Sequence, residues 1–595
     1  MTVARRHAFW NPHKPWKVVS DFRECSEQYF SGRVLLAYII DRFVSLNRSM
    51  YIRTTKNQRG DAYFHLVESF REGGKVKQRT LMSLGRVEDN RIDELAAAIS
   101  KHLETINIFN LSKEIDIADT YILGPLLVLE RMIENLGIKA ALQNVLSKHK
   151  KLLFDFEKVI FTQLSSRFIK PVSKLALYDS WVNRMYPELV DHKVELQHMY
   201  RSLDLLADHK EEIEKFLYQW KKDLFTLNVD VVLYDLTTLR FESTREDMGE
   251  LRKFGYSKEM RTDCTQVVLG LLTDTDGIPL CFEVHPGNTF EGKTLQGIVE
   301  KMRGKFSIRR FIFIADRGLF SFENLDHIRA DGGEFIVGLK MGSMTKLRQE
   351  DYYDRSKFTW INQELAFYET VLNGDRCIIT WSKSRYERDG KTREDILEKI
   401  RLKLAAEKKL AKKFITNRNY KKYLKTQGKD HCELNHAAIA EEAKKDGFFG
   451  IITNVASMSA SEIVTHYKQL WKIEDAFGEI KGTLKTRPMF HWTDKRITGH
   501  LVLCFLAYLC EAHLTKSLRE NQNQLDKKSI TKKIIKPRKL TVVQAMDELS
   551  RVMAIPVKVR KETIWVRTDI PPNAQNLMKA MGMRIPPKIL KEIKM

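Results

Sequence analysis

Five short apolar segments between residues 229 and 340 restrict the fold of this chain more than any other feature. Runs of this length, bounded by polar turns, are typical of buried strands. Helical patterns at 291–303 and about 320–330 separate the later segments, and Asp276-Gly277 is a hairpin signal between two of the earlier ones. The segments are VDVVLYD (229–235), TQVVLGLLT (265–273), IPLCFEVH (278–285), FIFIAD (311–316) and EFIVGLK (334–340).

The resulting order is three strands, helix, strand, helix, strand, which predicts an α/β fold with an RNase H-like core. In such a sheet the first and fourth strands are neighbours. Asp235 ends the first predicted strand and Asp316 ends the fourth, so their carboxylates are expected side by side at one sheet edge. A single Asp at a strand end has a structural role, as a helix cap or a turn former, about half the time.

A long helical pattern follows later, from Ser461 to about Lys485, with Ser461 and Glu462 as its expected N-terminal signal. Its apolar residues are expected to pack against the sheet; they are Val464, Leu470, Trp471 and Phe477. Tyr467, Glu474 and Lys481 are seven residues apart, so on one continuous helix they share a face. A Glu on a helix is more often solvated than catalytic, but this face is unusual for a core stripe.

Asp235, Asp316 and Glu474 are therefore the predicted catalytic and metal-binding carboxylates. Close carboxylates repel one another unless a cation neutralises them, and an oxygen-only ligand set suits Mg²⁺, with Mn²⁺ as a substitute. Two such ions support in-line displacement at phosphorus without a nucleophilic side chain. The predicted DNA-binding residues are Tyr467, Lys481, Lys485 and Arg487.

The charge balance favours a polyanionic partner. Lys and Arg outnumber Asp and Glu by 100 to 77, a formal net charge of +23. The stretches 401–425 and 515–539 carry net charges of +9 and +7, and each is either a solvated face or a DNA-contacting surface. The apolar stretch 501–509 is too short to span a bilayer, which predicts no membrane partner. The cysteines show no C-x-x-C pair, which fits a reducing cytoplasm. With the basic charge, the expected location is cytoplasmic and nucleoid-associated.

Composition shifts divide the chain into seven segments. The helical segment, residues 92–226, is either a DNA-binding region or a packed spacer. The segment after the fifth predicted strand, residues 341–446, contains strand-like pieces and a basic helical stretch. The segments are an unplaced N-terminal extension (1–49), a small β-rich unit (50–91), the helical region (92–226), the core's first part (227–340), an insertion (341–446), the core's second part with the catalytic helix (447–514) and a basic C-terminal region (515–595).

The sequence resembles insertion-sequence DDE transposases, whose last catalytic helix carries a Tyr-x2-Arg-x3-Glu-x6-Lys signature. HYKQLWKIEDAFGEIK matches its Tyr, Glu and Lys, but Leu470 replaces the Arg, and Lys468 or Lys472 is the alternative phosphate contact. GYSKEMRTDCTQVVLGLLTDTDGIPL and VHPGNTFEGKTL also look like the stretch between the two aspartates in these enzymes. The resemblance covers residues 50 to about 590.

The resemblance implies a β-rich insertion between the second Asp and the Glu. It also implies cleavage and strand transfer on double-stranded DNA, namely terminal inverted repeats and target DNA, by a homodimer or larger assembly. Two alternatives remain: a catalytically silent DNA-binding derivative of a transposase, and an RNase H-like nuclease that performs no strand transfer. The unbroken set of carboxylates weighs against the silent derivative.

Overall fold

The computed structural model of the chain divides into two compact units, which we describe separately. The first contains Met1–Ile117 and Val557–Thr563, and the second contains Ala118–Pro556 and Ile564–Met595. The structure describes residues 50–86, 115–117, 119–149, 151–225, 231–246, 249–256, 261, 263–290, 292, 294, 297–300, 306, 311–339, 352–406, 418–427, 431–487, 489–529, 541–559 and 562–590.

The first unit contains an antiparallel sheet of three strands, β1 (Met50–Lys56), β2 (Ala62–Glu72) and β3 (Lys75–Arg86). The turn between β2 and β3 is Gly73-Gly74, and both glycines have positive φ, as a tight hairpin turn requires. In the same unit β4 (Ile115–Ile117) pairs with residues 557–559. The predicted extension 1–49 lies outside the described residues.

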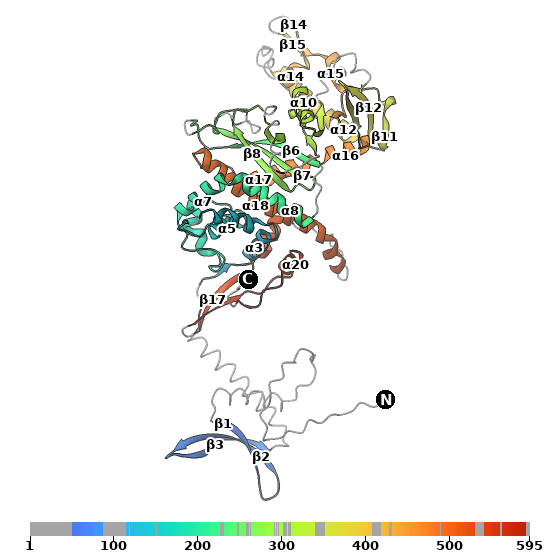
Figure 1. Cartoon of the computed structure of the whole chain (residues 1–595). Coiled ribbons are helices and arrows are strands. Elements are labelled where there is room, and N and C mark those ends of the chain that lie inside the picture. Colours follow the sequence, from blue (N-terminus) through green and yellow to red (C-terminus); the bar gives the residue numbers. More distant parts are fainter. Residues whose placement is uncertain are drawn as a thin grey trace, which may run out of the picture. The chain divides into compact units, whose positions relative to one another are not determined.

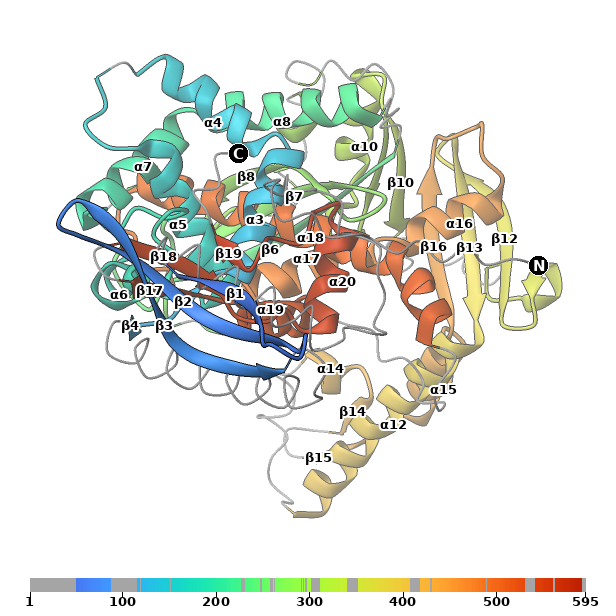
Figure 2. The same cartoon turned by 90° about the horizontal axis from the view of Figure 1, so that it is seen from below.

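The second unit is built on a nine-stranded sheet in the order β11-β12-β13-β16-β10-β9-β6-β7-β8 (Figures 1 and 2). Its strands are β6 (Val231–Arg240), β7 (Gln266–Asp274), β8 (Pro279–Pro286), β9 (Ile312–Ala315), β10 (Glu334–Leu339), β11 (Thr359–Asn362), β12 (Leu365–Leu372), β13 (Asp375–Ser382) and β16 (Phe448–Thr453).

The five strands predicted from the apolar segments form one half of this sheet. β6, β7 and β8 are an antiparallel meander, and β6, β9 and β10 run parallel, so the first and fourth of these strands are neighbours as predicted. Residues 297–300 are helical, and much of the helix expected at 291–303 lies outside the described residues.

One predicted strand end is wrong, because β6 continues five residues beyond Asp235 to Arg240. The residues that follow the aspartate are buried, including Thr237 and Thr238. Threonine is β-branched and fits a pleated strand, so these polar residues extend the strand instead of ending it. Asp235 consequently lies in the middle of β6.

Each face of the sheet carries its own apolar core. Helix α10 (Phe322–Ala330) packs on one face through Leu325 and Ile328. The other face is covered by helices α17 (Trp471–Lys481) and α18 (Asp494–Ser529), whose side chains share a core with the strands beneath them. The two faces therefore differ in which helices they meet, and this decides where the site residues point.

The residues after β10 extend the same sheet. β16 pairs with β10, and β13, β12 and β11 follow outward from β16. The segment that connects β13 to β16 in the sequence forms a helical arm (Figure 1). Part of the basic stretch 401–425 lies in this arm, while residues 407–417 are outside the described part. The arm consists of α12 (Lys383–Ala406), α14 (Arg418–Lys421), β14 (Leu424–Gln427), β15 (His431–Leu434) and α15 (His436–Ala443).

The helical region packs around α18, which contacts α5 and α7 and also β8 (Figure 1). By length and composition alone, residues Asp494–Glu520 of α18 could cross a membrane, but 83% of their most apolar stretch is buried inside the protein, as in a core helix. The region contains β5 (Tyr121–Ile122), α3 (Gly124–Asn135), α4 (Ile138–Ser147), α5 (Phe156–Ile169), α6 (Lys174–Ala176), α7 (Leu196–Asp208) and α8 (Lys210–Phe225).

The single helix predicted from Ser461 is wrong in two respects. Its N-cap is Ser459, which forms a reciprocal capping box with Glu462. The helix is also broken into α16 (Ala460–Lys468) and α17, because the residues between them form i→i−3 hydrogen bonds, which turn the chain more tightly than an α-helix.

The last elements of the described chain are α19 (Val542–Ser550), β17 (Met553–Val559), β18 (Glu562–Arg567), α20 (Pro572–Ala580) and β19 (Ile589–Leu590).

Candidate active site

The register of two parallel strands places Asp235 and Asp316 side by side. Tyr234 on β6 pairs with Ala315 on β9, so the next residue on each strand is one of the two aspartates. Asp316 follows the end of β9 but keeps an extended backbone conformation, with φ −70° and ψ 162°. Asp316 is exposed and Asp235 is half-buried. This is the neighbourhood that the order of the strands predicted.

Both aspartates belong to the face of the sheet that α17 covers. Leu233 and Ile314, two residues before each aspartate, lie in the core shared with α17, while Tyr234 and Ala315 lie in the opposite core. Because side chains alternate between the faces of a strand, the aspartates follow Leu233 and Ile314. The carboxylates therefore point to the side from which the last helices approach.

Tyr467 reaches Asp316 from α16, with its hydroxyl group 3.4 Å from Asp316 Oδ1. This approach depends on Gly338 in β10, where an added Cβ atom would lie 2.5 Å from the Tyr467 hydroxyl oxygen. Burial, together with the Asp316 carboxylate, raises the pKa of Tyr467 far above its usual value. The phenol therefore stays protonated and acts as a hydrogen-bond donor to the carboxylate.

Glu474 lies on α17, which packs against β6. The buried side of α17 consists of Ile473, Ala476, Phe477 and Ile480. Glu474 is exposed next to this buried side. Gly478, one turn later, has no heavy atom within 4 Å of an ideal Cβ position, so the helix surface from Glu474 to Lys481 is an open strip. Glu474 and Lys481 thus remain on one helix face.

Two details of the predicted face are wrong. Tyr467 is on α16, not on α17, so its spacing of seven from Glu474 no longer implies a common helix face. Trp471 is 47% exposed, although it was expected to pack against the sheet. Both errors have one cause, the tight turn between the two helices, which changes the phase of all residues after Leu470.

The candidate ligands are not assembled into a cage. Across the described ranges, no three His, Cys, Asp or Glu side chains are placed to hold a metal ion. The donor chemistry nevertheless fits a hard cation, since Asp235 and Asp316 supply oxygen ligands from adjacent strands and Glu474 is exposed on the helix above β6. Like charges hold such carboxylates apart until a cation neutralises them.

The basic residues after α17 are held along the end of β6. Lys485 has a positive φ of 44°, and the Arg167 guanidinium donates to its carbonyl oxygen at 3.3 Å. Burial and the nearby Arg240 lower the pKa of Arg487. A strained, exposed lysine whose backbone is fixed by another residue is a feature found at functional sites.

The two lysines proposed as substitutes for the missing arginine differ in their accessibility. Leu470 is buried and supplies no charge. The Lys472 ammonium donates to the carbonyl oxygen of Thr275, whereas Lys468 is exposed at the end of α16. Of the two, Lys468 is therefore the one that the structure leaves accessible.

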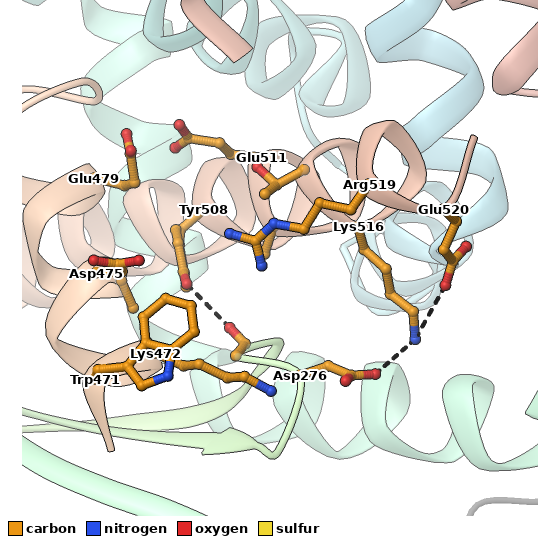
Figure 3. A pocket seen from close by; sticks show the side chains of 14 residues that line it. Asp276, Trp471, Lys472, Asp475, Glu479, Tyr508, Glu511, Lys516, Arg519 and Glu520 are labelled. Carbon is orange, nitrogen blue, oxygen red and sulfur yellow. Dashed lines mark hydrogen bonds and ion pairs between the residues drawn. The ribbon is translucent and has the colours of Figure 1, made fainter. Parts of the chain in front are cut away.

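Sequence reasoning missed a polar pocket of about 330 Å³ between α17, α18 and the β7–β8 turn (Figure 3). In Figure 3 the carboxyl groups of Glu479 and Glu511 point toward each other. Glu511 is 2% exposed, and burial and the Glu479 carboxylate raise its pKa to about 9. A single Glu within the apolar text LVLCFLAYLCEAHL was the available signal.

Glu511→Gln should make the unfolding free energy less sensitive to pH. Between its unfolded pKa of 4.5 and about 9, native Glu511 binds more protons than the unfolded chain, so its contribution to stability is lost as pH rises through this window. The glutamine stays neutral. Urea unfolding should show a gain for the variant that is larger at pH 8 than at pH 5 by at least about 1 kcal/mol. Equal gains at both pH values, or the same gain for exposed Glu520→Gln, would contradict this assignment.

Comparison with known families agrees with the geometry. Residues 229–510 match the family model described as "Transposase DDE domain", so the class of protein is that of the DDE transposases. Residues 52–110 match a second model, "IS1634 family transposase, N-terminal domain". The chain belongs to the insertion-sequence DDE transposases. No curated protein matches it.

Proposed function

We propose that this transposase cleaves DNA at the ends of its element and transfers those ends to target DNA, using a divalent metal held by Asp235, Asp316 and Glu474. The observation that carries the proposal is the register that brings the two aspartates together on neighbouring parallel strands. The strand order β8-β7-β6-β9-β10 supports an RNase H-like core, and we assign β11 to β13 with the helical arm to the β-rich insertion.

The residues of the chain have separate tasks in this proposal. Asp235 and Asp316 present carboxylate oxygens from rigid strands, and Tyr467 orients Asp316 by donating to Oδ1. Glu474 is exposed, so its side chain can turn toward the strands at little energetic cost. Bound Mg²⁺, or Mn²⁺ in its place, would activate the attacking oxygen and stabilise the leaving one at phosphorus.

Lys481, Lys485 and Arg487 are the proposed contacts to the DNA backbone. They follow Glu474 along α17 and the segment after it, which runs beside the end of β6, where Met489 donates to the Arg240 carbonyl oxygen at 3.3 Å. Phosphates held there would lie on the same side of the sheet as the carboxylates. The net charge of +23 supports association with double-stranded DNA in general.

Lys481→Ala should weaken DNA binding and also make it less dependent on salt. Each phosphate contact contributes about 0.9 to the slope of log K against log salt concentration. Titration of a duplex at several salt concentrations should therefore give a slope smaller by about 0.9 for this variant. Exposed Lys579→Ala on α20 removes the same charge elsewhere and should leave the slope unchanged. Equal slopes for Lys481→Ala and the unmodified protein would remove Lys481 from the DNA interface.

The expected partners are the terminal inverted repeats and target DNA, bound by at least a homodimer, and the expected location is the cytoplasm in association with the nucleoid. Incubating the purified protein with Mg²⁺, the DNA that flanks its reading frame and a second plasmid separates three outcomes. Cleaved and joined ends support the transposase. Cleavage without joining supports an RNase H-like nuclease, and binding without cleavage supports a silent DNA-binding derivative.

A further inference from the structure

A continuous stack of side chains connects the helical arm to Asp316. The Arg385 guanidinium, near the start of α12, lies over the Phe449 ring at 4.7 Å from its centroid. The Phe449 ring packs on Tyr467 with 5.1 Å between ring centroids, and the Tyr467 hydroxyl group lies 3.4 Å from Asp316 Oδ1. An arginine from the inserted segment is therefore held within two packed rings of a proposed metal ligand.

The charge of Arg385 is only partly compensated within the protein. Its Nε atom forms an ion pair with Asp389 Oδ2 at 3.5 Å, but this buried atom has no hydrogen-bond partner. Burial lowers the pKa of Arg385; the Asp389 carboxylate opposes this shift, and the neighbouring guanidinium groups of Arg388 and Arg317 add to it. A guanidinium group is always charged in proteins, so a further anion at Arg385 would add to the compensation that Asp389 supplies.

Arg317 brings a second guanidinium group to this place. It directly follows Asp316, is exposed, and forms no ion pair within the described part of the chain. Its backbone nitrogen and the Tyr467 hydroxyl oxygen lie 2.9 and 2.5 Å from one point, the ideal Cβ position of Gly338. The base of the Arg317 side chain is thus adjacent to the stack that holds Arg385.

We propose that Arg317 and Arg385 form an anion site that holds one backbone phosphate of DNA beside Asp316. This inference rests on the proposed function, because it assumes that DNA reaches the carboxylates. Guanidinium groups match phosphate oxygens with paired hydrogen bonds, which makes arginine the preferred residue for fixing a phosphate in one orientation. The helical arm would therefore help to position the DNA strand at the proposed site.

The test measures binding of a 30-base-pair duplex without Mg²⁺ to the full chain and to Arg385→Gln, Arg317→Gln, the double variant and Arg385→Lys. Each Gln substitution should weaken binding on the order of 10-fold, as expected for a hydrogen bond to a charged group. Because both arginines hold one phosphate, the double variant should lose less than the product of the two single losses. Arg385→Lys should retain most of the salt dependence that Arg385→Gln loses.

Lys391→Gln is the matched control, since it removes one exposed charge from another face of α12 and should not change affinity. Losses for the arginine variants no larger than for Lys391→Gln would overturn the inference, as would a fully multiplicative double variant. If Arg385→Gln unfolds, the exposed Arg317→Gln decides by the same criterion. Failure of the unmodified protein to bind any duplex would instead count against the proposed function.

Discussion

Asp316→Asn should reduce DNA cleavage by more than about 100-fold while leaving DNA binding nearly unchanged. Loss of even an outer-shell partner of a metal site costs roughly 10- to 100-fold, so loss of a direct ligand costs more. The amide keeps the size of the carboxylate but removes the charge that holds a cation. Asp316 is exposed after the end of β9, so the substitution should not disturb the fold. Gel analysis of cleaved DNA and a binding titration measure the two effects.

Asp475→Asn provides the matched control for this experiment. Asp475 is an exposed carboxylate on α17, next to Glu474, but it lines the separate pocket of Figure 3. It should keep full cleavage activity, whereas Glu474→Gln should behave as Asp316→Asn does. Equal losses for Asp475 and Glu474 would show that the effect comes from general charge on α17. Undiminished cleavage by Asp316→Asn would remove this aspartate from the metal site.

Gly499→Ala should lower the unfolding free energy by about 1–3 kcal/mol or more, because overpacking a well-packed contact carries a cost of this size. Gly499 lies where α18 crosses α7, and an added methyl group would overlap the backbone carbonyl group of Leu203. A backbone group at a helix crossing cannot move aside as a flexible side chain can. Intrinsic helix propensity alone predicts the opposite sign, a gain of up to about 1 kcal/mol. Denaturant unfolding monitored by circular dichroism gives the value.

Gly478→Ala separates packing from propensity. Gly478 is also a helical glycine, but no heavy atom lies within 4 Å of an ideal Cβ position there. The substitution should therefore stabilise the chain by about 0.5–1 kcal/mol. If both glycine variants were stabilising, the close crossing of α18 and α7 would be wrong. Destabilisation by both would mean that other atoms of the protein fill the space beside Gly478.

Much of the sheet could be predicted because its information is local. Each apolar segment of the core half is short and ends at polar turn residues, and Gly277 has the positive φ that the Asp276-Gly277 hairpin signal predicts. The neighbourhood of Asp235 and Asp316 then followed from the strand order. The end of β6 was wrong because a charged residue looked like a strand end, whereas Thr237 and Thr238 continue the strand.

The arrangement around the carboxylates was less predictable because it depends on contacts distant in sequence. The turn before α17 is fixed by packing of both helices against the sheet, and no proline or glycine marks it in HYKQLWKIE. Arg385 lies over Phe449, and Phe449 packs on Tyr467, although these three residues belong to segments that are far apart in the sequence. The requirement for glycine at position 338 comes from the Tyr467 hydroxyl group, which is distant in sequence and would overlap an added Cβ atom.

The most direct test of the central claim is metal rescue of Asp316→Cys, measured as cleavage of the flanking DNA with Mg²⁺ and with Mn²⁺. A thiolate is a softer ligand than a carboxylate and accepts Mn²⁺ more readily than Mg²⁺. If Asp316 binds the catalytic metal, the variant should be inactive with Mg²⁺ and regain cleavage with Mn²⁺, while Asp316→Asn stays inactive with both. Equal activity of Asp316→Cys with the two metals would contradict the assignment of Asp316 as a metal ligand.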